Sequence, residues 1–220
     1  MREPPTRRAR YHDNTIVRQL PQDPSSEILV DHHSAAGPVI TTVRGSLLVS
    51  AIERLKAYGH HERYLEKLPK ALHDEMQFSL AMSRLPVELL VEHCRACDTL
   101  ELSDAELLQL GSQTASSMAQ AMLGALLRTA GTTPLTVLGQ TARIYERLFE
   151  GGSCMVYRTG PKDVCIEQSG NPLAPSRYFR TTAQGFYKSL AEMFSKTAYV
   201  KAARARHSPA LAFAIELSWV

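Results

Sequence analysis

The sequence predicts an α+β fold in which a helical N-terminal half packs on a C-terminal antiparallel sheet. Before residue 150 the apolar residues recur mostly at the three- and four-residue spacing of amphipathic helices. After it, two pairs of short strands flank one helix, in the order hairpin, helix, hairpin. The last strand alternates apolar and small or polar residues, which is typical of an antiparallel strand that buries one face.

Length and composition are those of a globular protein. A chain of 220 residues can form one large domain or two small ones, and its 44% apolar and 21% charged content is ordinary. Residues 1–26 carry prolines and arginines but few large apolar side chains, so they cannot offset their ordering entropy. We therefore expect residues 1–26 to be a disordered basic arm and residues 27–220 to be a single domain of the ligand-binding or regulatory type.

Charge and cysteine content exclude several classes of partner and setting. Part of the formal charge of +3 lies in the arm, so the body is nearly neutral and nucleic acid is not an expected partner. Four cysteines in a chain of this length do not make a disulfide framework. There is no apolar run long enough for a membrane span and no secretory signal. We expect a cytoplasmic protein with reduced thiols.

The first half is predicted to contain two short strands and a series of helices. Gly59 is placed to cap the first helix, and Pro69 divides the following apolar pattern into two short helices. Asp31-His32-His33 follows the first strand and is interpreted as a polar loop rather than a metal site. The expected elements are strands over 27–30 and 38–43 and helices over 45–58, 62–78 with its break, and 84–98.

A long helix with small side chains follows. Ser103 and Glu106 form a capping-box pattern that starts a helix over 104–129, and Pro134 opens another helix that runs to Phe149. The small residues in the second half of the long helix permit close helix packing, which we favour, or leave room for a cavity. The cavity candidates on this helix are Ala115, Met118, Ala119 and Met122.

The C-terminal unit is the predicted sheet. We expect strands over 154–157 and 163–167, a helix over 177–195 that brings Tyr178 and Phe186 to the candidate cavity, and strands over 197–207 and 211–219. Cys154 and Cys165 are equidistant from Thr159-Gly160, so a two-residue turn there would place them directly opposite each other.

No motif in the sequence indicates a catalytic site. A Gly-rich phosphate loop, a nucleophile elbow and a recognisable carboxylate pair are all missing, so we name no catalytic residue and do not expect an enzyme. His93 precedes Cys94 and Cys97, whereas covalent haem attachment needs the histidine after the second cysteine. A zinc site of Cys94, Cys97, Cys154 and Cys165 is arithmetically possible, but ordinary buried thiols are the favoured interpretation.

Basic residues of the C-terminal unit form a candidate anion-binding surface. Alternation places Arg204 and Arg206 on one face of their strand, and a solvated surface is the favoured alternative to an anion site. The full set of candidates is Arg177, Arg180, Lys201, Arg204 and Arg206.

The order of elements resembles the NO-signalling and Golgi-transport ligand-binding superfamily, which includes haem-based NO sensors, the 4-vinyl reductase domain and TRAPP vesicle-tethering subunits. Within it, the sequence is similar to a paralogous group of myxobacterial proteins. The resemblance spans about residues 39–220 and rests on the segments Val43-Arg-Gly-Ser-Leu-Leu48, Leu85-Pro-Val-Glu-Leu-Leu90, Ala142-Arg-Ile-Tyr145 with Gly151-Gly152, Tyr178 with Gly185, and Phe213-Ala-Ile-Glu-Leu-Ser-Trp219.

The resemblance implies a fold used for small-molecule sensing or protein interaction, often as a homodimer. Haem-type members use a helix histidine and a Tyr-x-Ser-x-Arg motif, and this chain lacks that motif, which argues against haem. We therefore predict no cofactor. The expected function is a non-catalytic regulatory or sensor module for a small apolar or anionic ligand. A protein–protein adaptor and a metal- or thiol-dependent sensor or enzyme are the alternatives.

Overall fold

The fold is α+β and is built around a five-stranded antiparallel sheet with the order β1-β5-β6-β8-β7. The computed structural model describes residues 27–122, 133–206 and 211–220, with the backbone alone for 116–122. The predicted basic arm, residues 1–26, lies outside the described residues. The strands are β1 (Glu27–His33), β5 (Ser153–Gly160), β6 (Asp163–Ser169), β7 (Ala198–Ala203) and β8 (Phe213–Trp219).

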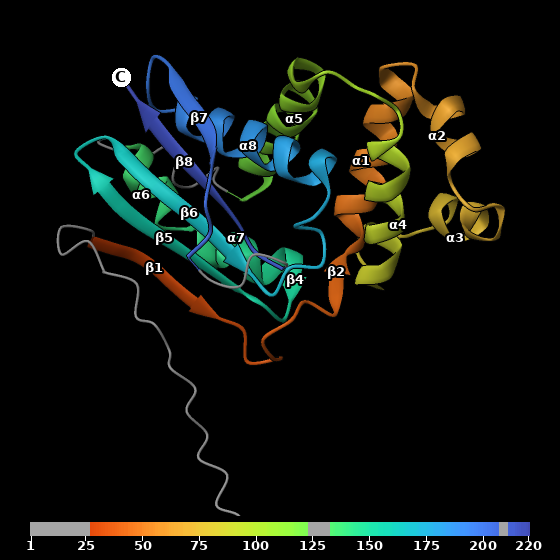
Figure 1. Ribbon diagram of the computed structural model, residues 1–220, viewed down its shortest axis with the longest axis horizontal. Helices are drawn as coiled ribbons and strands as arrows, with labels where there is room; N and C mark the ends of the chain where they lie inside the picture. Colours follow the sequence, from red (N-terminus) through yellow and green to blue (C-terminus); the bar gives the residue numbers. More distant parts are fainter. Residues whose placement is uncertain (1–26, 123–132, 207–210) are drawn as a thin grey trace, which may run out of the picture.

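The helical half lies to one side of this sheet, and α2 and α3 are farthest from it (Figure 1). A small second sheet, in the order β3-β2-β4, joins the two halves. The elements of this part are β2 (Thr42–Arg44), α1 (Gly45–Ala57), α2 (His61–Lys67), a 3-10 turn (Lys70–Leu72), α3 (His73–Gln77), β3 (Arg84–Pro86), α4 (Val87–Asp98), α5 (Asp104–Met122), α6 (Pro134–Leu138), α7 (Thr141–Leu148) and β4 (Phe149–Glu150).

The predicted hairpin–helix–hairpin unit is confirmed. The helix between the hairpins is α8 (Arg177–Glu192), and β8 buries its predicted apolar face, including Ile215 and Leu217 at 1% exposure each. Buried side chains of α8, the sheet and the helical half belong to one continuous hydrophobic cluster. The sheet and the helical half therefore share a core.

Helix α5 packs tightly against α8, as the favoured interpretation of its small residues predicted. A Cβ atom added at Gly111 of α5 would lie 1.9 Å from the carbonyl oxygen of Thr182 on α8. In the same way, a Cβ at Gly185 of α8 would lie 2.0 Å from the carbonyl oxygen of Leu108 on α5. Two glycines thus allow the two backbones to approach more closely than any side chain would permit.

Four local predictions are wrong. Residues 84–86, predicted as the start of a helix, form β3, and α4 begins only at Val87. The segment Asp31-His32-His33 is not a loop but continues β1, which forms the edge of the main sheet next to β5. The helix predicted from Pro134 to Phe149 is divided at Gly139-Gln140 into α6 and α7. Cys154 does not pair with Cys165, because the strands meet through Gly160 and Asp163, and this register pairs Cys154 with Gln168.

The capping predictions hold. The backbone N–H of Ser103 donates to Glu106 Oε2 at 2.8 Å, and the backbone N–H of Glu106 donates to Ser103 Oγ at 3.3 Å, which is the reciprocal pair of a capping box. Gly59 has a φ of +75° after α1, which is the left-handed conformation of a helix C-cap. Among the described helices, none has the length and apolar character needed to cross a bilayer.

Candidate site: an apolar cavity between the helical half and α8

A cavity lies where α1, α4, α5 and α7 meet α8 and the sheet. Its volume is about 120 Å³, within a wider unoccupied region of about 880 Å³ that is partly open to solvent. The described residues that line it are mostly aliphatic or aromatic: Leu47, Ala51, Arg54, Leu90, His93, Cys94, Leu110, Thr114, Ile144, Tyr145, Leu148, Phe149, Gln168, Tyr178, Phe179, Thr182, Ala183, Phe186 and Tyr187. Apolar walls with a few polar groups are typical of small-molecule sites.

His93 is the one histidine among the described lining residues, and it is fully buried. Its Nδ1 lies 3.1 Å from the hydroxyl oxygen of Tyr64, and its Nε2 lies 3.4 Å from that of Tyr178. Both tyrosine rings meet the imidazole edge-on, with ring centroids 5.2 and 5.4 Å away. Burial lowers the pKa of His93 to about 3, so the ring is neutral at physiological pH.

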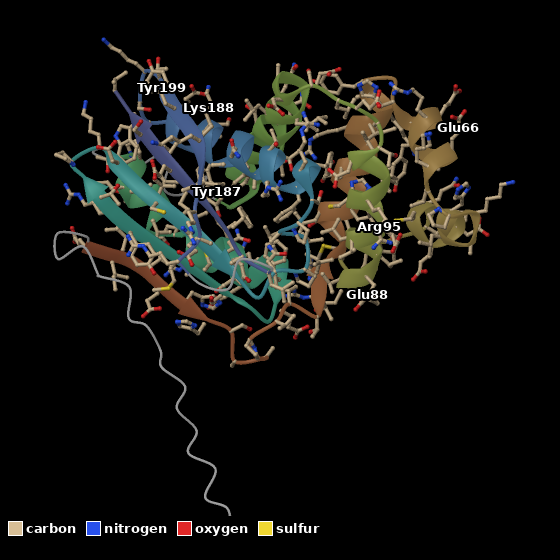
Figure 2. All side chains as sticks on the ribbon, viewed as in Figure 1. Glu66, Glu88, Arg95, Tyr187, Lys188 and Tyr199 are labelled. Carbon is tan, nitrogen blue, oxygen red and sulfur yellow. The ribbon has the colours of Figure 1, made fainter. Side chains whose placement is uncertain are left out.

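The sheet contributes a second polar group, Gln168. Asn171 Nδ2 donates to Gln168 Oε1 at 3.0 Å, and Gln168 Nε2 donates to the Tyr187 hydroxyl at 3.3 Å. Figure 2 labels Tyr187, which lies between α8 and the sheet, while Glu66 lies on α2 and Glu88 and Arg95 lie on α4 of the helical half. This network gives both the oxygen and the nitrogen of the buried amide a hydrogen-bond partner.

Arg54 is the one charged residue among the described residues that line the cavity. It lies on α1 one turn after Ala51 and two turns after Leu47, so all three share a helix face. The side chain is half-buried, and burial is the main reason that the pKa of its guanidinium is lowered. Sequence reasoning missed this residue. The sequence does contain a signal for Arg54, because an arginine on the apolar stripe of an amphipathic helix is unusual.

The cavity candidates named from the sequence divide into three groups. Tyr178 and Phe186 line the cavity. Ala115 is buried at 1% exposure but is not among the lining residues. The side chains of Met118, Ala119 and Met122 lie outside the described residues. The cavity therefore faces the first half of α5, through Leu110 and Thr114, as far as the described residues show.

The candidate anion surface is not a single surface, because its members bind separate partners. Arg177 donates to Asp104 Oδ1 at 2.5 Å, and Arg180 donates to the carbonyl oxygens of Ala174 and Pro175. Lys201 Nζ lies 2.6 Å from Glu216 Oε2. The Arg206 guanidinium stacks 4.3 Å above the ring centre of Tyr157, and Arg204 is exposed.

The four cysteines are all unpaired and buried, and they do not converge. Cys94 and Cys97 lie on α4 near His93, with Cys97 Sγ 3.6 Å from His93 Nε2. Cys154 lies in the main core, whereas Cys165 belongs to a small cluster with Tyr157 and Ala214. Within the described part of the chain, no group of three or more His, Cys, Asp or Glu side chains could hold a metal ion.

Comparison with known proteins finds similarity in structure but not in sequence. No family model matches the chain, and no curated protein matches it. A crystal structure of an Fe(II) unliganded H-NOX protein from K. algicida has a TM-score of 0.60 at 12% identity, covering 80% of this chain and 96% of that one. An oxygen-binding H-NOX domain related to soluble guanylate cyclases has a TM-score of 0.54 at 10% identity, covering 80% and 94%.

This finding corrects the cofactor prediction. The sequence led us to expect no cofactor and argued against haem, but the solved structures that share the fold are haem proteins of the H-NOX family, one of them studied for haem distortion. A missing Tyr-x-Ser-x-Arg motif is not sufficient ground to set haem aside, because one short motif does not define what a cavity can hold. The likeness spans four fifths of this chain, which therefore has the fold of H-NOX domains.

Proposed function

We propose that this protein is a sensor module that binds a small ligand in the apolar cavity between the helical half and α8. The observation that supports this most strongly is the cavity itself, because close-packed interiors rarely leave unoccupied space beside several aromatic side chains. Cys97 Sγ lies 3.6 Å from His93 Nε2, but burial raises the pKa of this thiol and lowers that of the imidazole, so we propose binding rather than catalysis. The buried, unpaired cysteines support the cytoplasmic setting expected from the sequence.

Haem is the first ligand to test, and the donor set fits it in part. A neutral imidazole is the form that binds iron, and metal-bound histidines usually have their second nitrogen held by a hydrogen bond. His93 is neutral, and Tyr64 holds its Nδ1. Its Nε2 would have to leave the long contact with Tyr178. Arg54 is the cation available for an acidic side group. Bound haem would supply an iron centre that can bind diatomic gases.

The volume of the cavity suits haem less well than the donor set does. A cavity of about 120 Å³ holds a molecule of roughly the size of one aromatic ring, by analogy with engineered cavities of about 150 Å³ that bind benzene. A porphyrin is much larger and would need the part of the surrounding region that is open to solvent. A compact apolar ligand needs no such extension, so the proposal covers both cases.

Two titrations test the proposal. Toluene, a neutral apolar molecule of one aromatic ring, should bind saturably at one site per chain in a calorimetric titration. Ala51→Leu places a larger side chain in the cavity and should weaken binding by about tenfold or more, because a filled cavity excludes toluene. Ala57→Leu, at the exposed end of the same helix, is the matched control.

Haemin added to the same protein should give a Soret band that His93→Gln shifts or abolishes, if haem is the ligand. A toluene titration without saturation, together with no haemin spectrum, would contradict the proposed function. The expected homodimer and protein partner stay predictions, and light scattering during size-exclusion chromatography measures the oligomeric state directly.

A further inference from the structure

Arg54 differs from the other polar residues that line the cavity, because their side chains have hydrogen-bond partners inside the protein. Thr114 Oγ1 donates to the carbonyl oxygen of Leu110 at 3.1 Å, and Thr182 Oγ1 donates to that of Tyr178 at 2.9 Å. Tyr145 donates its hydroxyl proton to the carbonyl oxygen of Gly151 at 3.2 Å. These groups have their hydrogen-bonding needs met without a ligand.

The guanidinium of Arg54 makes no hydrogen bond and no ion pair with any residue that the structure describes. This contrasts with Arg63, Arg158 and Arg177, each of which donates to a carbonyl or carboxylate oxygen. Glu53, the adjacent acid on α1, is exposed and does not pair with Arg54. Tyr178, Glu53 and Tyr58 are the neighbouring groups whose charges favour the protonated guanidinium.

The cavity therefore has a positive charge that is not balanced within its described lining. The described lining contains no aspartate or glutamate. Burial removes hydration from this cation, and no hydrogen bond or ion pair with a described residue replaces it, which is unfavourable for the empty protein. A guanidinium also presents five N–H donors in a planar fork, a geometry that matches a carboxylate.

We propose that the ligand of this cavity is an amphipathic acid, with an apolar body among the aromatic side chains and one carboxylate paired with Arg54. This inference rests on the proposed ligand-binding function and adds the chemical class of the ligand. Neither the apolar walls nor the shared fold requires the ligand to have a carboxylate. It follows from one unpaired cation that faces an apolar space, because such a site favours an anion over a neutral molecule of the same shape.

A matched pair of probes tests the inference: octanoic acid, which is ionised at pH 7.5, and 1-octanol, which has the same chain length and no charge. Calorimetric titration should show octanoate binding at least about tenfold more tightly than octanol, since a hydrogen-bonded ion pair of this kind typically contributes that much. Arg54→Gln should remove the difference by weakening octanoate alone. Arg54→Lys, which keeps the charge but loses the fork, should restore part of it.

Control variants separate this inference from the underlying function. Lys56→Gln removes an exposed charge from the same helix and should leave the preference for octanoate unchanged. Ala51→Leu should weaken both probes. Equal affinities for the two probes in the wild-type protein, or a preference that persists in Arg54→Gln, would overturn the assignment of Arg54 while leaving the cavity function intact. If neither probe binds, the proposal of an acidic ligand fails, and the two titrations described above decide the proposed function separately.

Discussion

Acidification should destabilise this protein through His93, and the size of the effect can be worked out from the structure. The pKa of a histidine is near 6.5 in an unfolded chain, and burial lowers that of His93 to about 3 in the folded protein. Between these values the unfolded state binds one proton that the folded state does not. The free energy of unfolding therefore falls as pH falls, by about 1.4 kcal/mol per pH unit.

From pH 6.5 to pH 4 this single group should cost about 3 kcal/mol of stability, a large share of the total for a typical domain. Urea unfolding at several pH values, followed by the fluorescence of Trp219 and by circular dichroism, measures the slope. His93→Gln should be less stable at pH 7, because it changes the contacts with Tyr64 and Tyr178. Its stability should nevertheless fall less steeply with acid than that of the wild type.

The comparison of slopes isolates His93, because all other titrating groups are common to both proteins. Parallel stability profiles for the wild type and His93→Gln between pH 6.5 and pH 4 would refute the reasoning. They would mean that His93 is protonated or solvated in the folded state, contrary to its burial between two tyrosines.

Three further predictions concern packing, capping and thiol chemistry. Gly111→Ala should lower the free energy of unfolding by about 3 kcal/mol or more in thermal melts, because the added Cβ would overlap the backbone of α8. Gly139→Ala is the control and should be tolerated, because its added Cβ would have only ordinary contacts at 3.4 Å. Ser103→Ala should cost about 1 kcal/mol in urea unfolding by removing the capping box of α5, and a loss near zero would show that the cap is dispensable. Native protein at pH 8 should react slowly with a thiol reagent at all four cysteines, since burial raises their pKa values, and rapid labelling of any thiol before unfolding would contradict this.

Much of the secondary structure followed from local patterns. The strand alternation that ends in Trp219, the capping box at Ser103 and the break at Pro69 all depend on neighbouring residues, so the sequence contains the relevant information. The errors lie where a segment distant in the sequence determines the local structure. The final residues of β1 extend as a strand because β5 offers hydrogen bonds to them, although β5 lies more than 100 residues away.

The candidate site was harder to predict, because its members come from five helices and the sheet. In the sequence His93 stands beside Cys94 and Cys97, whereas its tyrosine partners lie 29 and 85 positions away. Spacing along the chain does not predict contacts between residues that far apart in the sequence. In the candidate anion surface the opposite holds: residues close in sequence, such as Arg177 and Arg180, donate to different partners.

The sequence by itself determined the α+β class, the hairpin–helix–hairpin order and most helix boundaries, because these depend on hydrophobic periodicity and on caps within a few residues. Tertiary structure alone decided the strand register, the close contact of α5 with α8, and the cavity. Register depends on which turn closes the hairpin, and here Gly160 and Asp163 meet around Pro161-Lys162 and shift Cys165 away from Cys154. The cavity exists only once α1, α4 and α8 are packed together, and that packing leaves Arg54 facing an apolar space without a partner among the described residues.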